Sequence, residues 1–214
     1  PQTRLTTSSG RRTYTLASGL STTTTHHVML FKTSEASSGV ATIHGFEVGD
    51  DALVHALPAR PPRRLEFLGD SITAGWGNLC SNRQGDIFTD SSNWFAWGNQ
   101  LSLLLNAEAH TVAWSGRGLY KNRDGKLQAS GETMDHVYRR TLGTVDSNDW
   151  SFSSWTPDAV FILLGENDYH ASGGAPTTSQ WVGAMTTLVA DIRSRYSPDP
   201  HLFIGCGPMS DDMC

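Results

Sequence analysis

After residue 63, short apolar runs alternate with segments whose apolar residues recur at helical spacing. The runs predict strands at 65–68, 109–114, 159–164 and 201–205, and the periodic segments predict helices at about 92–105, 133–142 and 178–196. Alternation of strands and helices is typical of a parallel sheet that is covered by helices on both faces. The sequence therefore predicts an α/β domain over residues 64–214.

The first 57 residues have a different pattern. Three short runs rich in β-branched and aromatic residues, at 13–16, 27–31 and 40–46, are separated by clusters of Ser, Thr and Gly. This spacing is typical of a β-sandwich. The proline-rich stretch 58–63 is a stiff linker, so we expect a domain boundary there and the C-terminal part of a β-sandwich domain at 1–57.

The composition argues against two classes of partner. A formal net charge of −5 at pH 7 disfavours nucleic acid and anionic membrane surfaces, and no apolar stretch approaches the roughly 20 residues that span a bilayer. None of the 8 histidines falls in a helical metal-ligand pattern, so no metal site is expected. The 3 cysteines leave two interpretations open, a Cys206–Cys214 disulfide with Cys80 outside it, or three reduced thiols.

The motif Gly69-Asp70-Ser71 ends the first expected strand. A sharp turn there lifts the serine hydroxyl to the carboxyl edge of the sheet, where open α/β sheets place their reaction sites. Because the next residues start a helix, Ser71 also lies where free backbone N–H groups point toward an incoming anion. The alternative is that Ser71 only caps that helix.

Two further polar blocks follow later strands. Gly116 comes after the second expected strand, and Asn167 comes after the third, in a Gly-Glu-Asn-Asp block. Acyl transfer needs a nucleophile, a base and donors aimed at the developing oxyanion. Ser71 supplies the hydroxyl, and the candidate donors are its own N–H, the N–H of Gly116 and the side-chain amide of Asn167. The structural alternatives are a plain turn glycine at 116 and capping by Asn167 and Asp168.

Aromatic and basic residues near these blocks are candidate substrate contacts. Of the 7 tryptophans, Trp76 and Trp114 lie near the proposed cleft, and sugar-binding sites use aromatic faces. Arg117 is the candidate anchor for a hydroxylated or acidic substrate. Core packing for the tryptophans and a solvated surface position for Arg117 remain open.

Together these blocks resemble the family 2 carbohydrate esterases, a branch of the SGNH (GDSL-type) hydrolases. The resemblance lies in the segments 33–36, 43–48, 64–78, 112–118, 134–142 and 157–168. It covers nearly the whole chain and implies a flavodoxin-like, three-layer SGNH fold with a parallel sheet. The two earliest segments resemble the last strands of the jelly-roll-like β-sandwich that precedes the hydrolase domain in that family.

The resemblance implies a secreted serine esterase that removes O-acetyl groups from plant-type polysaccharides such as xylan or glucomannan. Ser71 is then the nucleophile, and Ser71, Gly116 and Asn167 form the oxyanion hole. No metal or organic cofactor is expected, and the partner is an acetylated polysaccharide or oligosaccharide rather than nucleic acid or membrane. Glu166 stands where the family commonly has threonine, and we expect its carboxylate to face away from the oxyanion.

The catalytic base of that family is a histidine in a late D-x-x-H block, and no such block occurs in these 214 residues. Asp168-Tyr169-His170 and Asp199-Pro200-His201 have a different spacing. We expect the chain to be truncated at both ends and nearly inactive, because a serine hydroxyl without an imidazole is a poor nucleophile at neutral pH. If this piece were active, His170 would be the first candidate for the base.

Two other functions remain open. An apolar trough beside Ser71 would favour a GDSL lipase or thioesterase acting on longer acyl chains. The chain could also be a glycan-binding protein that has lost catalysis. The joint presence of Ser71, Gly116 and Asn167 favours the esterase, because a binding module has no need for all three.

Overall fold

The computed structural model describes residues 3–50, 52–81, 89–205 and 207–208. The chain divides into two units, which we describe separately. One consists of Pro1–Leu30 and His44–Leu57, and the other of Phe31–Ile43 and Pro58–Cys214. The segment Phe31–Ile43 therefore groups with the α/β unit.

The first unit has no regular strand or helix among its described residues. The strands expected at 13–16 and 27–31 are absent, and so is the one expected at 40–46. Val28 and Phe46 are 61% and 63% exposed. Because a strand is stabilised by pairing and by burial of one face, these residues lack both sources of stability, and the strand prediction is wrong here.

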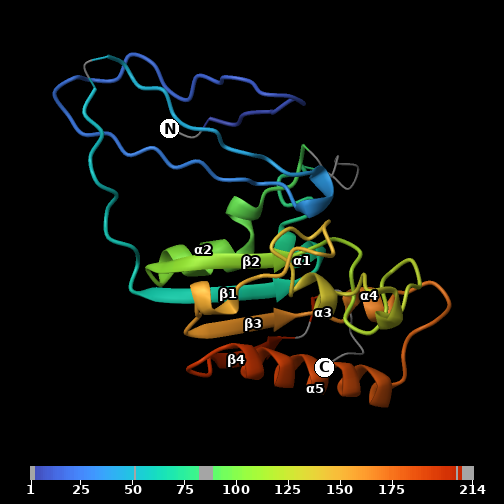
Figure 1. Cartoon of the computed structure of the whole chain (residues 1–214). Coiled ribbons are helices and arrows are strands. Elements are labelled where there is room, and N and C mark those ends of the chain that lie inside the picture. The colour runs from blue at the N-terminus through green and yellow to red at the C-terminus, as the bar shows by residue number, and fades with distance from the viewer. Residues whose placement is uncertain (1–2, 51, 82–88, 206, 209–214) are drawn as a thin grey trace. The chain divides into compact units, whose positions relative to one another are not determined.

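The second unit is built on a 4-stranded parallel sheet with the order β2-β1-β3-β4. Its strands are β1 Arg63–Gly69, β2 Ala107–Ala113, β3 Ala159–Leu163 and β4 His201–Gly205. All four expected strands are confirmed, and Figure 1 shows their arrows running in the same direction. In this order β2 lies on one side of β1 and β3 lies on the other, so the direction of the chain across the sheet reverses between β1 and β3. Open α/β sheets bind ligands in the crevice at the carboxyl ends of the two strands where this reversal occurs.

Helices cover both faces of the sheet, so the expected three layers are confirmed. The α-helices are α1 Ser71–Ala74, α2 Trp97–Leu104, α3 Met134–Val137, α4 Glu166–Tyr169 and α5 Thr178–Arg195. Neighbouring residues of a strand point to opposite faces. Phe67 of β1 therefore packs against Trp97 of α2, with ring centroids 5.1 Å apart. Leu68 joins the other core, which contains Leu188 and Ile192 of α5. No helix of the described residues is long and apolar enough to cross a membrane.

Two expected helices are shorter than predicted. The helix expected at 92–105 is interrupted at Ala96, which has an extended backbone. The side-chain amides of Asn99 and Gln100 donate to the carbonyl of Trp94 at 2.8 and 2.7 Å and take the acceptor that a continuous helix would use. The helix expected at 133–142 ends at Val137, since the residues that follow it pair with the segment 148–150.

Candidate active site

Ser71 is the first residue of α1, and a single residue separates it from β1. That residue, Asp70, is the N-cap, and its carboxylate accepts the N–H of Ile72 at 3.0 Å. The helix ends after one turn because Gly75 takes a left-handed conformation, with a φ of 84°. Ser71 is half-buried, so the predicted strand–turn–helix leaves the serine partly exposed at the edge of the sheet.

The ends of three strands lie level at this edge. Gly69 of β1 pairs with Ala113 of β2 and with Leu163 of β3. Gly116 and Asn167 follow β2 and β3 closely in the chain. Figure 1 shows α1 and α4 at the arrowhead end of the sheet. The structure therefore brings the three predicted blocks to one edge.

Asn167 links two of these blocks through its side chain. It is buried on α4, and its Nδ2 donates to the carbonyl oxygen of Arg117 at 2.8 Å. The same nitrogen donates to Oδ2 of Asp70 at 3.3 Å. The amide is thus placed beside the residue that precedes the serine.

Asp168 of α4 is hydrogen-bonded to the loop after β2. Its carboxylate is fully buried and accepts the backbone N–H groups of Leu119, Tyr120 and Lys121 at 2.9, 2.6 and 2.9 Å. Burial raises the pKa of Asp168, although these three donors act to lower it. From the sequence, the roles considered for Asp168 were those of a capping or turn residue. Its observed partners are backbone N–H groups, so no pattern of side chains could have indicated them.

Gly116 lies in an open turn ahead of that loop. Its φ is 79°, in the left-handed region that favours glycine. Its carbonyl accepts the N–H of Arg123 at 3.0 Å. A Cβ at this position would meet nothing within 4 Å, so the turn leaves space for a substrate to approach the backbone.

The two candidate tryptophans differ in availability. Trp76 is 55% exposed, and its backbone N–H donates to the carbonyl of Ser71 at 2.9 Å. Trp114 packs against the core cluster of α5. The guanidinium of Arg117 also lies 4.6 Å from the centroid of its ring. Trp76 is therefore the more accessible aromatic face.

Arg117 is engaged within the protein. Its Nη1 donates to Glu132 at 2.7 Å. Hydrogen bonds from Lys126 and then from Arg117 lower the pKa of Glu132 to about 2. The sequence left a substrate contact and a solvated surface position open for Arg117, and the structure places its guanidinium against Glu132 and Trp114.

Glu166 is the first residue of α4, next to Asn167, and His170 follows the end of that helix. Glu166 is buried, and a Cβ on Gly207, after β4, would collide with its carboxylate. The carboxylate thus lies toward β4, whereas Gly116 follows β2 at the opposite edge of the sheet. His170 is exposed, and its Nδ1 bonds to the carbonyl of Glu166 at 2.8 Å. No histidine among the described residues is hydrogen-bonded to Ser71.

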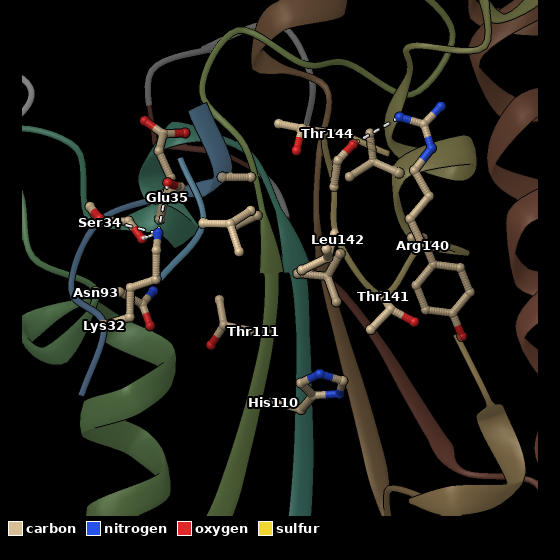
Figure 2. Close-up of a pocket in the computed structure, with 18 of the residues that line it drawn as sticks. Lys32, Ser34, Glu35, Asn93, His110, Thr111, Arg140, Thr141, Leu142 and Thr144 are labelled. Carbon is tan, nitrogen blue, oxygen red and sulfur yellow. Dashed lines mark hydrogen bonds between the residues drawn. The ribbon is translucent and has the colours of Figure 1, made fainter. Parts of the chain in front are cut away.

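A cavity of about 360 Å³ runs along β2 and is separate from the serine. Figure 2 shows Lys32, Ser34 and Glu35 on one wall and Arg140 and Thr141 on the other. Its lining contains none of the three predicted catalytic residues. In the part of the chain that the structure describes, no three His, Cys, Asp or Glu side chains gather as a metal site. Cys206 and Cys214 lie outside that part.

Asp70 should make stability depend on pH. Burial, and then the charges of Glu166 and Asp168, raise its pKa to about 7. Between about pH 4 and pH 7 the unfolded chain releases this proton and the folded chain keeps it, so stability falls as pH rises. A pKa difference of one corresponds to about 1.4 kcal/mol, so the loss is at most about 4 kcal/mol.

Urea denaturation at several pH values measures this effect. Asp70→Asn should flatten the curve of unfolding free energy against pH, since asparagine still accepts the N–H of Ile72 but carries no proton to release. The exposed Asp199→Asn is the control and should leave the curve unchanged. Parallel curves for Asp70→Asn and the unmodified protein would refute the assignment.

Two family models match most of the chain. The GDSL-like Lipase/Acylhydrolase family matches residues 67–213. The Carbohydrate esterase 2 N-terminal family matches residues 1–58.

Similar proteins carry related names. Cellulase/esterase CelE of Acetivibrio thermocellus is 36% identical over 185 residues, which are 86% of this chain and 22% of CelE. An acetylxylan esterase / glucomannan deacetylase of Cellvibrio japonicus is 31% identical over 147 residues, which are 67% of this chain and 40% of that protein. The chain thus spans less than half the length of either relative.

Solved structures share the fold. A family two carbohydrate esterase from Clostridium thermocellum, in complex with cellohexaose, is 33% identical, with a TM-score of 0.66. The match covers 73% of this chain and 46% of that one. A family 2 enzyme with a carbohydrate binding domain, from Corynascus thermopiles, is 32% identical with a TM-score of 0.68, over 77% of this chain and 50% of that one.

Proposed function

This chain belongs to the GDSL-like lipase/acylhydrolase family, and from that premise we propose that it carries the nucleophile of a carbohydrate esterase. Its substrates are the O-acetyl groups of plant-type polysaccharides such as xylan or glucomannan. The name of the Cellvibrio japonicus relative supports this class of ester, and the name of CelE supports an esterase. We also propose that the protein is secreted, because such polysaccharides lie outside cells.

One observation carries the proposal. The serine at the start of α1 shares the sheet edge with the buried amide of Asn167 and the open turn at Gly116. The amide bonds to Asp70, the residue before the serine, at 3.3 Å. This is the grouping of nucleophile and donors that acyl transfer requires.

In the proposed reaction, Oγ of Ser71 attacks the acetyl carbonyl carbon and its proton passes to a base. The oxyanion accepts the N–H groups of Ser71 and Gly116 and one N–H of Asn167. We assign to the oxyanion the amide hydrogen that now reaches Asp70 at 3.3 Å, because the 2.8 Å bond to Arg117 keeps the side chain in place. The base returns the proton to the sugar oxygen, which leaves as a hydroxyl. Water, deprotonated by the base, then attacks the acetyl-serine, acetate leaves, and the serine oxygen takes back the proton.

Added imidazole provides the test, because it substitutes for a histidine side chain as the base. We expect the chain to release little acetate from an acetylated xylo-oligosaccharide on its own. General base catalysis typically contributes about 10²–10⁴-fold, so we expect a gain of at least about tenfold with imidazole. Ser71→Ala should abolish that gain, and Ser153→Ala, which removes an exposed hydroxyl, should retain it.

Other outcomes would point elsewhere. An imidazole-dependent gain that persists in Ser71→Ala would contradict the assignment of the nucleophile. Preference for long acyl chains would indicate a GDSL lipase or thioesterase. Glycan binding without any turnover, unchanged in Ser71→Ala, would indicate a binding protein. Strong turnover without imidazole would mean that the chain holds its own base, and His170→Ala would be the first variant to examine.

A further inference from the structure

The segment Phe31–Ile43 belongs to the same unit as the sheet and reaches the proposed site through Glu35. Oε2 of Glu35 accepts the backbone N–H of Ser115 at 2.6 Å. Ser115 immediately precedes Gly116, whose N–H is a proposed oxyanion donor. A hydrogen bond to a carboxylate is roughly twice as strong as a neutral one, so a residue far away in the sequence holds this turn.

The backbone around Glu35 is itself fixed. Nζ of Lys32 donates to the carbonyls of Ser34 and Glu35 at 2.7 and 3.0 Å, as the dashed lines in Figure 2 show. The carbonyl of Thr33 accepts the N–H of Asn93 at 2.9 Å. The backbone on the N-terminal side of Glu35 is therefore held by Lys32 within the segment and by Asn93 outside it.

Other hydrogen bonds hold the later part of the turn: the N–H of Arg117 donates to the carbonyl of Trp114 at 3.3 Å, and the carbonyl of Arg117 accepts the side chain of Asn167. On its far side, the carbonyl of Gly116 accepts the N–H of Arg123. Glycine is free to rotate, and nothing lies within 4 Å of the Cβ position at Gly116. Without Glu35, the peptide between Trp114 and Ser115 would lose its bond to the carboxylate, and the direction of the N–H of the next residue, Gly116, would be less defined.

We propose that Glu35 is a positioning residue for the oxyanion hole: its bond to the N–H of Ser115 directs the N–H of Gly116 toward the reacting carbonyl. The proposal rests on the esterase function proposed above. Glu35 does not touch the substrate and acts only through the turn. Its role is that of an acceptor, so a neutral side chain with an oxygen in the same place should substitute for it.

The experiment uses the whole chain with a fixed concentration of imidazole and an acetylated xylo-oligosaccharide. Loss of one oxyanion donor costs about 100- to 1000-fold, and a loosened donor should cost less, so we expect Glu35→Ala to lower kcat by about tenfold with KM unchanged. Glu35→Gln should recover most of kcat. Glu47→Ala, at an exposed glutamate of the other unit, is the matched control and should leave kcat unchanged.

A second measurement does not depend on turnover. Amide hydrogen exchange of Ser115, followed by NMR, should be faster in Glu35→Ala and close to the unmodified protein in Glu35→Gln. Three results for Glu35→Ala would each overturn the proposal. The first is an unchanged kcat, the second is a rise in KM together with a loss of thermal stability, and the third is unchanged hydrogen exchange at Ser115. If the unmodified chain and Ser71→Ala are equally inactive with imidazole, the esterase proposal fails, and exchange at Ser115 alone then decides whether Glu35 holds the turn.

Discussion

Replacing Asp168 by alanine is expected to lower the free energy of unfolding by about 5 kcal/mol, comparable to the whole stability of a small domain, about 5–15 kcal/mol. The carboxylate is the acceptor for the N–H groups of Leu119, Tyr120 and Lys121. Each buried donor left without a partner costs about 1–3 kcal/mol, and the N–H of Leu119 is buried while those of Tyr120 and Lys121 are half-buried. Urea denaturation followed by tryptophan fluorescence measures the change.

Two companion variants make this result specific. Asp168→Asn keeps one oxygen as an acceptor, so we expect it to lose about half as much stability as Asp168→Ala. Asp199 is exposed, and Asp199→Ala should change stability by no more than about 0.5 kcal/mol. Asp168→Ala with the stability of the unmodified protein would show that the loop after β2 is held in another way.

Gly118→Ala is expected to destabilise the protein by about 3–4 kcal/mol, above the usual cost of overpacking, about 1–3 kcal/mol, and to remove the imidazole-dependent release of acetate. The added Cβ would overlap the carbonyl oxygen of Lys121 and lie 2.6 Å from Oδ2 of Asp168. The first of these atoms is backbone, and the second belongs to a carboxylate that accepts three hydrogen bonds. The loop therefore has to move, and the Gly116 turn at its start moves with it.

Gly183→Ala is the matched control and should have the opposite sign. Gly183 lies on the exposed side of α5, where an added Cβ meets nothing within 4 Å. Alanine is favoured over glycine in a helix by about 1 kcal/mol. Thermal and urea unfolding of both variants test the pair. Equal effects of the two substitutions would mean that the packing around Gly118 is loose.

Local sequence patterns correctly predicted the strands of the α/β unit but wrongly predicted strands in the first unit. Continuous apolar runs between turn residues are typical of buried parallel strands, and all four such runs form strands. The runs at 13–16 and 27–31 have the same β-forming composition but find no partner strand among the described residues. β-propensity alone does not form a strand, because its stability comes from pairing and burial.

The ends of the helices depend on contacts that cannot be inferred from the spacing of apolar residues. The capping box of Thr177 and Gln180 marks the start of α5 where the sequence predicts it. Side chains bound to the carbonyl of Trp94 interrupt the preceding helical segment before α2. When a side chain occupies a backbone carbonyl, the helix is interrupted there, although the spacing of apolar residues in the sequence stays helical.

By itself the sequence determined the parallel sheet and the position of Ser71 at a strand–turn–helix junction, because apolar periodicity and turn chemistry act between neighbours in the chain. Only the tertiary structure decided which groups hold the site together. It paired Asp168 with the loop after β2, Glu35 with Ser115, and Arg117 with Glu132. The first two carboxylates bind backbone N–H groups, which every residue but proline carries, so only the folded path of the chain selects their partners.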